Sequence, residues 1–156
     1  MAAFKSVGHI ALRVNDLKET LDFYEKLGFP EFLRLDQEAG RPWIVYLKVS
    51  DELYLELFPG GDGGKAAGPE HTGVHHLCLT TEDIEATEAH LKAVGITPTS
   101  ALRKDHRGVD GNRGMWITDP NGNRIEIMEM APGCIQYEAL QALRTTGAPT
   151  ALLRPV

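Results

Sequence analysis

The sequence predicts an α+β protein built from two βαβββ modules, and an internal repeat is the main observation behind this prediction. Each half contains an alternating strand, an amphipathic helix that ends at glycine, and three further strand-like segments. A glycine- and proline-rich segment separates the halves. At one constant shift of 67 positions (9 to 76), chemically similar residues align: His9 with His76, Asp16 with Asp83, and Gly28 with Gly95.

The first module is expected over residues 1–58. Residues 5–13 alternate between two faces, as a strand does. Asp16 is a typical N-cap for the helix that follows, and Gly28 is a typical residue just beyond a helix end. The apolar stripe of this helix consists of Leu17, Leu21, Tyr24 and Leu27. Three strands are expected after it, at about 31–35, 43–49 and 52–58.

A linker is expected over 59–72, followed by the second module over 73–131 and a C-terminal tail over 132–156. Asp83 should cap the second helix, and Gly95 should end it. The tail contains a short helical pattern over 136–144. The strands of the second module are predicted at about 74–80, 97–102, 113–118 and 124–130, with a tight hairpin turn at 119–123 between the last two.

In each module the helix covers only one face of the sheet. A four-stranded sheet with one bare face is unstable by itself, so the two modules should combine their open faces. The predicted result is an eight-stranded, cleft-forming half-barrel.

Composition and charge exclude several classes of function. The formal net charge is −6, and no basic stripe with interspersed aromatic residues is present, so nucleic acid is not an expected partner. No apolar run is long enough for a membrane span, and the first residues lack a signal-peptide pattern. Cys78 and Cys134 lack metal-binding or redox spacing and are expected to be free thiols, so the predicted compartment is the cytoplasm.

Two histidines and two glutamates occupy equivalent positions in the repeat. His9 and His76 lie in the first strand of each module, and Glu56 and Glu126 lie in the last strand. Taken singly, a strand histidine or glutamate is usually an exposed or hydrogen-bonded surface group. Four such groups gathered in one cleft would be costly without a cation. The set therefore predicts one divalent metal ion (Zn, Ni, Co, Mn or Fe) held by His9, Glu56, His76 and Glu126.

His75 is an alternative to His76 as the ligand. Strand alternation places His75 on the helix side, and only His76 aligns with His9. We therefore choose His76.

The sequence resembles the vicinal oxygen chelate superfamily, which contains glyoxalase I. The resemblance extends from His9 to Glu129 and rests on H-I-A-L-R-V-N-D-L, F-Y-E-K-L-G-F, G-V-H-H-L-C-L and D-P-N-G-N-R-I-E-I. It implies a metal that chelates two neighbouring oxygens of a small-molecule substrate and stabilises an enediolate. By the same analogy, Glu126 is the main catalytic base and Glu56 is its counterpart.

The superfamily contains several activities. Extradiol dioxygenases use two histidines and one carboxylate, and a second glutamate here would fill the position left for oxygen. Bleomycin-binding proteins generally lack the metal ligands, so four ligands argue against that non-catalytic class. If the chain did belong to it, the binding cleft of the dimer would be lined by Trp43, Tyr54, Phe58, Trp116 and Met128.

The choice between glyoxalase I and an epimerase depends on a few positions. Arg13 matches an arginine that grips the glutathione carboxylate in glyoxalases, but Gly60 and Thr72 stand where those enzymes carry glutathione-binding residues. The G-V-H-H-L-C-L run is closer to the epimerases, although those usually have glutamine at the position of Glu56. We favour a metal-dependent isomerase or epimerase acting on a small oxygenated substrate, with lactoylglutathione lyase as the alternative.

The remaining expectations concern the substrate and the assembly. A homodimer is predicted, and the metal site could form within one chain or across a swapped pair. The residues expected to contact substrate are Arg13, Tyr54, Phe58, Arg113, Trp116 and Met128.

Overall fold

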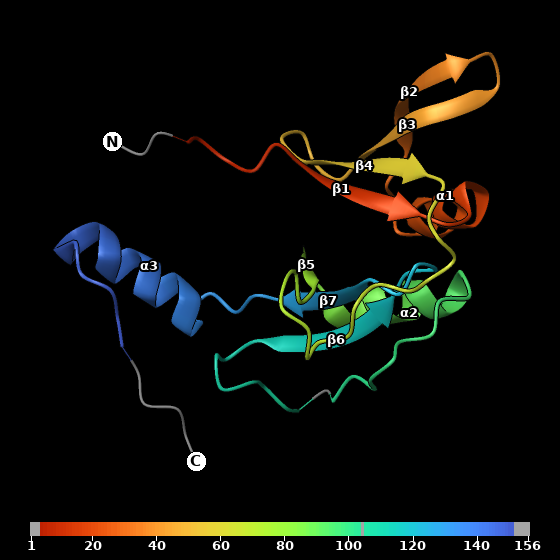
Figure 1. The fold of residues 1–156 in the computed structure, drawn as a ribbon. Helices are drawn as coiled ribbons and strands as arrows, with labels where there is room; N and C mark the ends of the chain where they lie inside the picture. Colours follow the sequence, from red (N-terminus) through yellow and green to blue (C-terminus); the bar gives the residue numbers. More distant parts are fainter. Residues whose placement is uncertain (1–3, 104, 152–156) are drawn as a thin grey trace. The chain divides into compact units, whose positions relative to one another are not determined.

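A computed structural model describes residues 4–103 and 105–151 of the chain (Figure 1). These residues belong to two compact units. Unit 1 comprises Met1–His71 together with Asp119–Asn123, and unit 2 comprises Thr72–Thr118 together with Arg124–Val156. Each unit contains a mixed sheet and a helix that follows its first strand, which confirms the predicted α+β class and the repeated module.

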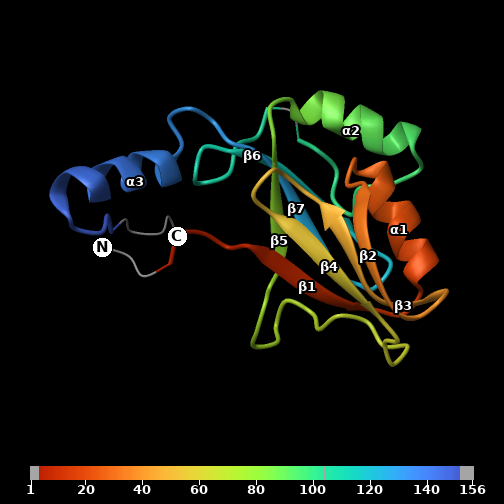
Figure 2. The ribbon, with the colours of Figure 1, turned by 90° about the horizontal axis from the view of Figure 1, so that it is seen from above.

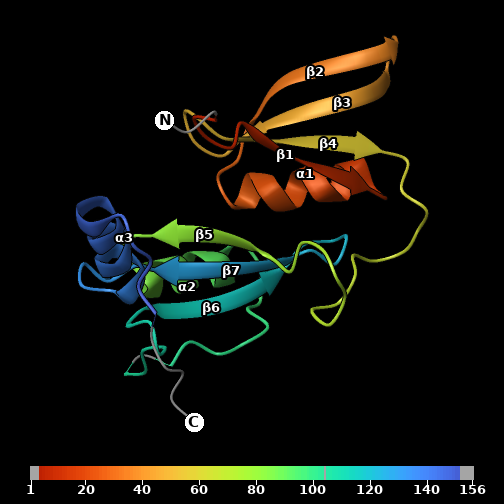
Figure 3. The ribbon, with the colours of Figure 1, turned by 60° about the vertical axis from the view of Figure 1, so that its left-hand side comes forward.

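Unit 1 contains a four-stranded sheet in the order β1-β4-β3-β2. The first strand, β1, runs parallel to β4, whereas β3 is antiparallel to both of its neighbours. Helix α1 lies along one face of this sheet (Figure 3). The elements are β1 (His9–Val14), α1 (Leu17–Lys26), β2 (Glu31–Glu38), β3 (Arg41–Lys48) and β4 (Tyr54–Pro59), close to the ranges that the sequence predicts.

Local sequence explains how α1 begins and ends. The Asp16 side chain accepts a hydrogen bond from the Glu19 backbone N–H at 2.9 Å, as predicted for an N-cap. Gly28 has a φ of 84°, a left-handed conformation that glycine adopts without a Cβ penalty. Leu55 and Leu57 of β4 are buried, whereas Glu56 between them is not. The face opposite Leu55 and Leu57 therefore carries His9, Tyr54 and Glu56.

Unit 2 repeats this pattern with a three-stranded sheet in the order β5-β7-β6. Asp83 caps its helix by accepting hydrogen bonds from the backbone N–H groups of Glu85 and Ala86. Its two helices, α2 and α3, are seen separately in Figure 2. The elements are β5 (Leu77–Thr81), α2 (Ile84–Ala93), β6 (Arg113–Thr118), β7 (Arg124–Glu129) and α3 (Ile135–Thr146). Of the described helices, none is long and apolar enough to cross a membrane.

The strand predicted at 97–102 is wrong: these residues form no regular strand. The segment does approach β6, because the Thr99 backbone N–H donates to the Trp116 carbonyl oxygen at 2.7 Å. Pro98 has no backbone N–H, so it cannot donate a hydrogen bond to a strand ladder. The described residues therefore form seven strands, and the sheet of unit 2 lacks the fourth strand that the repeat predicted.

The predicted hairpin turn at 119–123 is present and belongs to unit 1, although it joins two strands of unit 2. Gly122 closes it with a φ of 88° and a backbone bond to the Asp119 carbonyl oxygen. Asn121 accepts a hydrogen bond from the Asn15 backbone N–H and donates one to the Thr20 hydroxyl. Asp119 accepts one from the Tyr24 hydroxyl. Hydrogen bonds made by the side chains of the turn thus hold it against α1 and the β1–α1 connection within unit 1.

Candidate functional site

In unit 1, β1 and β4 bring His9 and Glu56 together. Parallel pairing sets Tyr54 opposite His9 and Ala11 opposite Glu56. The His9 Nε2 then lies 3.5 Å from the Glu56 Oε2, and the imidazole stacks on the Tyr54 ring at a centroid distance of 5.4 Å. The Glu56 side chain is 13% exposed, so its carboxylate is shielded but open to a ligand.

Tyr46 is a further member of this site, and it is missing from the set predicted from the sequence. It lies directly opposite Glu56 in the β3–β4 pairing, and its ring contacts the Tyr54 ring. Burial, followed by the charge of Glu56, raises the pKa of the Tyr46 hydroxyl, which therefore stays protonated beside the carboxylate. The shift that relates Glu56 to Glu126 also relates Tyr46 to Trp116, so the repeat carried this signal.

In unit 2, His76 and Glu126 form the equivalent pair. The His76 Nε2 lies 3.3 Å from the Glu126 Oε2, and the Trp116 ring meets the imidazole edge-on at 4.9 Å. Trp116 is directly opposite Glu126 in the β6–β7 pairing, just as Tyr46 is opposite Glu56. The two units therefore repeat the same local geometry around a histidine–glutamate pair.

Cys78 lies opposite Glu126, at the position that Ala11 occupies in unit 1. Burial and the charge of Glu126 raise the pKa of the Cys78 thiol to about 11. The thiol is consequently neutral near pH 7 and is a poor nucleophile there. Neither Cys78 nor Cys134 forms a disulfide, as the sequence predicts.

His75 is not on the helix side, contrary to the alternation argument. Its Nδ1 lies 2.6 Å from the His76 Nδ1, and its Nε2 lies 3.2 Å from Nη1 of Arg124. The physical reason is that β5 begins at Leu77, so strand alternation does not govern residue 75. His76 still faces Glu126, and it remains the predicted ligand.

Each histidine–glutamate pair fits half of a divalent metal site. Nitrogen and oxygen ligands bound about 2.1 Å from one ion stand roughly 3.4 Å apart at a tetrahedral angle. The observed separations of 3.5 Å and 3.3 Å match this spacing. Within either unit, over the residues described, no group of three or more His, Cys, Asp or Glu side chains forms a metal site. One pair alone would leave most of the coordination shell to water.

A pocket of about 330 Å³ adjoins Glu126 within unit 2. Arg113, Trp116 and Met128, three of the predicted substrate contacts, belong to its lining. The loop after α2 also contributes to the lining, including Arg103 and His106. The pocket therefore combines an aromatic and aliphatic wall with basic groups and one carboxylate.

Arg13 and Phe58 lie further along β1 and β4 in unit 1. The Arg13 guanidinium stands over the Phe58 ring at 5.6 Å and donates to the Pro59 carbonyl oxygen at 2.9 Å. Arg13 also lines a separate polar pocket of about 460 Å³ formed by the linker and the 119–123 turn. Arg13 remains exposed, so its guanidinium can still donate hydrogen bonds to a ligand.

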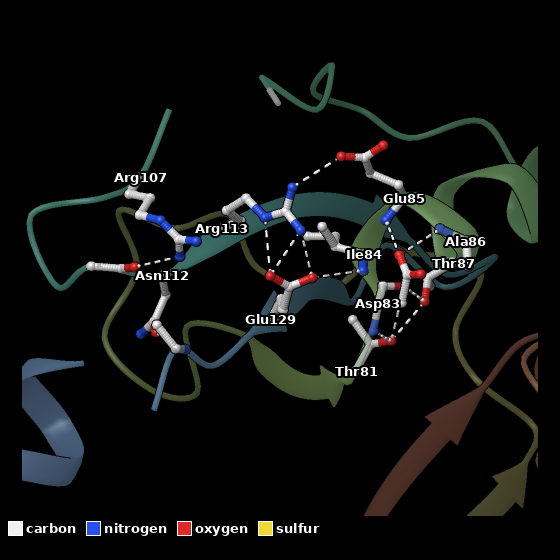
Figure 4. Close-up of polar contacts among 12 residues, drawn as sticks. Thr81, Asp83, Ile84, Glu85, Ala86, Thr87, Arg107, Asn112, Arg113 and Glu129 are labelled. Atoms are coloured by element: carbon white, nitrogen blue, oxygen red, sulfur yellow. Dashed lines mark hydrogen bonds and ion pairs between the residues drawn. The ribbon is translucent and has the colours of Figure 1, made fainter. Parts of the chain in front are cut away.

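Arg113 is bound to carboxylates on the helix-covered face of unit 2 (Figure 4). Its Nη2 lies 2.7 Å from the Glu129 Oε2, and its Nη1 lies 3.0 Å from the Glu85 Oε1 at the start of α2. Glu126 is on the opposite side of β7, because residues alternate along a strand. Arg113 nevertheless belongs to the lining of the pocket beside Glu126, and substrate binding by its guanidinium, which Glu129 and Glu85 already hold, stays a prediction.

This ion pair gives a prediction about pH and stability. Hydrogen bonding from Arg113 lowers the pKa of Glu129 below its ordinary 4.5. The unfolded chain protonates at the ordinary value, so the stabilisation is complete above about pH 4.5 and is lost as pH falls through the folded pKa. Glu129→Gln should therefore flatten the acid limb of stability, measured as urea unfolding free energy against pH. Glu138→Gln, on the exposed side of α3, is the control that should keep the wild-type slope; equal slopes for both variants would contradict the prediction.

The chain is similar to several known proteins. A model of the Glyoxalase/Bleomycin resistance protein/Dioxygenase superfamily matches residues 6–127. The uncharacterized protein YaeR of Escherichia coli is 29% identical over 131 residues, covering 83% of this chain and 99% of YaeR. Lactoylglutathione lyase of Pseudomonas aeruginosa is 27% identical over 146 residues, covering 78% and 80% respectively. The crystal structure of a glyoxalase family protein from Enterococcus faecalis matches with a TM-score of 0.68 at 29% identity, covering 81% of this chain and 98% of that one.

Proposed function

Because this chain belongs to the Glyoxalase/Bleomycin resistance protein/Dioxygenase superfamily, we propose that it is a divalent-metal-dependent isomerase or epimerase. Its reaction would move a proton on the carbon next to a carbonyl group of a small oxygenated substrate. The observation that carries this proposal is the repeated pair, His9 with Glu56 and His76 with Glu126, each at the spacing of two ligands on one ion.

We infer that one cation takes both pairs, since two ligands rarely hold a divalent ion tightly. The bound cation would withdraw electron density from the carbonyl and so acidify the neighbouring C–H bond. Glu126 takes the proton and later returns it, because it adjoins the pocket with Trp116 and Met128. Glu56 serves as the second base, with Tyr46 and Tyr54 forming its aromatic wall.

Lactoylglutathione lyase is the second candidate function. Similarity to curated lactoylglutathione lyases and the exposed guanidinium of Arg13 favour it. Gly60 and Thr72, which replace the glutathione-binding residues expected by resemblance, favour the isomerase. The two candidates use the same metal chemistry and differ in the substrate that they require.

Solvent deuterium exchange separates these candidates. The metal-loaded protein would be incubated in D₂O with dihydroxyacetone, methylmalonyl-CoA or the glutathione hemithioacetal of methylglyoxal, and deuterium at the α-carbon followed by NMR. Exchange without glutathione supports the isomerase. Turnover only of the hemithioacetal would support the lyase instead, and exchange of none of the three would count against both.

Metal content is a separate prediction. The protein loaded with Zn²⁺, Ni²⁺, Co²⁺, Mn²⁺ or Fe²⁺ and then desalted should retain about one ion per chain, measured by mass spectrometry of the elements. The double variant Glu56→Ala/Glu126→Ala should lose at least tenfold in affinity, because half of the ligands are gone. Glu52→Ala/Glu138→Ala is the control with the same charge change. Occupancy that survives the first double variant would remove both glutamates from the ligand set.

We further propose a homodimer, and complementation tests whether the site is shared between chains. Chains carrying Glu56→Ala and chains carrying Glu126→Ala would be refolded together. In a swapped dimer, each mixed pair rebuilds one intact ligand set, so exchange activity returns. A site formed within one chain leaves the mixture inactive.

A further inference from the structure

Four polar groups in unit 2 form a continuous row that ends at Glu126. Nη1 of Arg124 lies 3.2 Å from Nε2 of His75. Nδ1 of His75 lies 2.6 Å from Nδ1 of His76. Nε2 of His76 lies 3.3 Å from Oε2 of Glu126. Each imidazole therefore has a neighbour at both of its ring nitrogens.

The direction of this row follows from Arg124, because a guanidinium only donates hydrogen bonds. Nε2 of His75 must then accept, which places the His75 proton on Nδ1. That Nδ1–H donates to Nδ1 of His76, so the His76 proton sits on Nε2 and faces the Glu126 carboxylate. Any other assignment brings two donors or two lone pairs together at one of these contacts.

We propose that Arg124 and His75 act as positioning residues that set the tautomer of His76, and that the row reverses when His76 binds a cation. This step rests on the proposed metal-dependent function. A metal ligand needs an unprotonated Nε2, so the His76 proton must move to Nδ1. The Nδ1–H of His76 then donates to Nδ1 of His75, and the His75 proton moves to Nε2.

The reversal conserves charge on both histidines. One proton crosses the 2.6 Å contact from Nδ1 of His75 to Nδ1 of His76. His76 gives the proton on its Nε2 to water, and Nε2 of His75 takes one from water. The hydrogen bond between Arg124 and His75 is lost, because two N–H groups now face each other there.

Trp116 gives Arg124 a second contact that survives this loss. The Arg124 guanidinium stands over the Trp116 ring at 4.4 Å, and the same ring meets His76 edge-on. Unit 1 has no equivalent row: the repeat places Gly8 where unit 2 has His75, and Tyr54 where it has Arg124. The device is therefore specific to the pair that contains Glu126.

Long-range ¹H–¹⁵N NMR of the histidine side chains tests the row directly. The metal-free protein would be studied in alkaline buffer at about pH 8.5. We expect the His75 proton on Nδ1 and the His76 proton on Nε2. Saturation with Zn²⁺ alone should move them to Nε2 and Nδ1 respectively. A metal-free His75 protonated on Nε2 would overturn the proposal.

A double-mutant cycle adds an energetic test by Zn²⁺ titration. Arg124→Leu should raise Zn²⁺ affinity about fivefold to tenfold, since binding no longer breaks a hydrogen bond. In a His75→Leu background the same substitution should have a clearly smaller effect, which then reports only the lost positive charge. Equal effects in both backgrounds would overturn the coupling. Arg107→Leu, which removes an exposed arginine bonded to the Gly111 carbonyl, is the matched control.

The two proposals fail in different ways. Absence of Zn²⁺ binding by the wild-type protein would overturn the metal-dependent function and the reversal together. A Zn²⁺-saturated protein whose histidine tautomers do not change would overturn the reversal alone.

Discussion

Glu126→Gln should lower the rate of α-proton exchange by about 10³-fold, the loss expected when a positioned general base is removed. The substitution keeps the shape of the side chain and the Cys78 and Trp116 neighbours. It removes the carboxylate that adjoins the pocket wall formed by Trp116 and Met128. The measurement is deuterium incorporation in D₂O at the α-carbon of dihydroxyacetone, methylmalonyl-CoA or the glutathione hemithioacetal, whichever of them the wild-type protein deuterates.

Glu126 is also a proposed metal ligand, so exchange must be divided by bound metal in the same sample. A drop that disappears after this correction would assign Glu126 to metal binding and not to proton transfer. Glu52→Gln, at an exposed position just before β4, should keep the wild-type rate. It controls for the loss of one negative charge.

Glu56→Gln distinguishes an epimerase from a one-base isomerase. With one base for each face of the substrate, each variant should stop exchange from one α-carbon epimer of methylmalonyl-CoA and spare it from the other. The two variants should therefore prefer opposite epimers. Loss of exchange from both epimers in Glu126→Gln, with little effect of Glu56→Gln, would support a single base.

The repeat made much of the fold and the histidine–glutamate pairs predictable. Asp16 and Asp83 cap the helices as expected. A shift of 67 positions (9 to 76) relates the two histidines, and a shift of 70 positions (56 to 126) relates the two glutamates. Hydrophobic alternation was sufficient here because Leu55, Leu57, Ile125 and Ile127 are buried on one face. Their neighbours Glu56 and Glu126 must then lie on the other.

Features that depend on loop geometry or on contacts with other elements were not predictable in the same way. The repeat suggested a strand at 97–102, but Pro98 lacks the backbone N–H that a ladder needs. Alternation misplaced His75 because the strand begins after it. Arg113 is a polar residue at a strand start, and only the structure reveals that Glu129 and Glu85 bind its guanidinium.

Tyr46 was missed for a different reason. Aromatic residues in strands are usually explained by packing, so Tyr46 carried no chemical signal of its own. Its importance follows from cross-strand pairing with Glu56, and pairing depends on register. Comparing Tyr46 with Trp116 at the shift that relates the glutamates would have identified it.

Asp119→Ala should destabilise the protein by about 3–4 kcal/mol, because it leaves several buried donors without partners. Asp119 is 4% exposed, and its side chain accepts four hydrogen bonds. Two come from the backbone N–H groups of Asn121 and Asn123, at 2.8 Å each. The others come from the Tyr24 hydroxyl at 3.0 Å and the Asn123 side-chain amide at 2.9 Å.

Graded variants test whether these bonds are the cause. Burial and the charge of Asp119 raise the pKa of Tyr24, so its hydroxyl stays a donor at any ordinary pH. Tyr24→Phe removes that one donor and should cost about 1–2 kcal/mol. Asp62→Ala removes an exposed aspartate that accepts a single turn hydrogen bond, and it should cost about 0.5 kcal/mol or less. Urea unfolding gives all three values, and a loss for Asp119→Ala no larger than that for Asp62→Ala would contradict the prediction.

The position of the 119–123 turn in the chain gives a stricter test than the size of the stability loss. Asp119–Asn123 belongs to unit 1 but joins β6 to β7, the strands that carry Trp116 and Glu126. Weakening the turn should therefore destabilise both units at once. Tryptophan fluorescence can report this, because Trp43 lies in unit 1 and Trp116 in unit 2. In Asp119→Ala, the single-tryptophan variants Trp43→Phe and Trp116→Phe should show equal shifts of the urea midpoint. A shift of the urea midpoint seen only in the Trp116→Phe variant, whose remaining tryptophan is Trp43, would mean that the turn stabilises unit 1 alone.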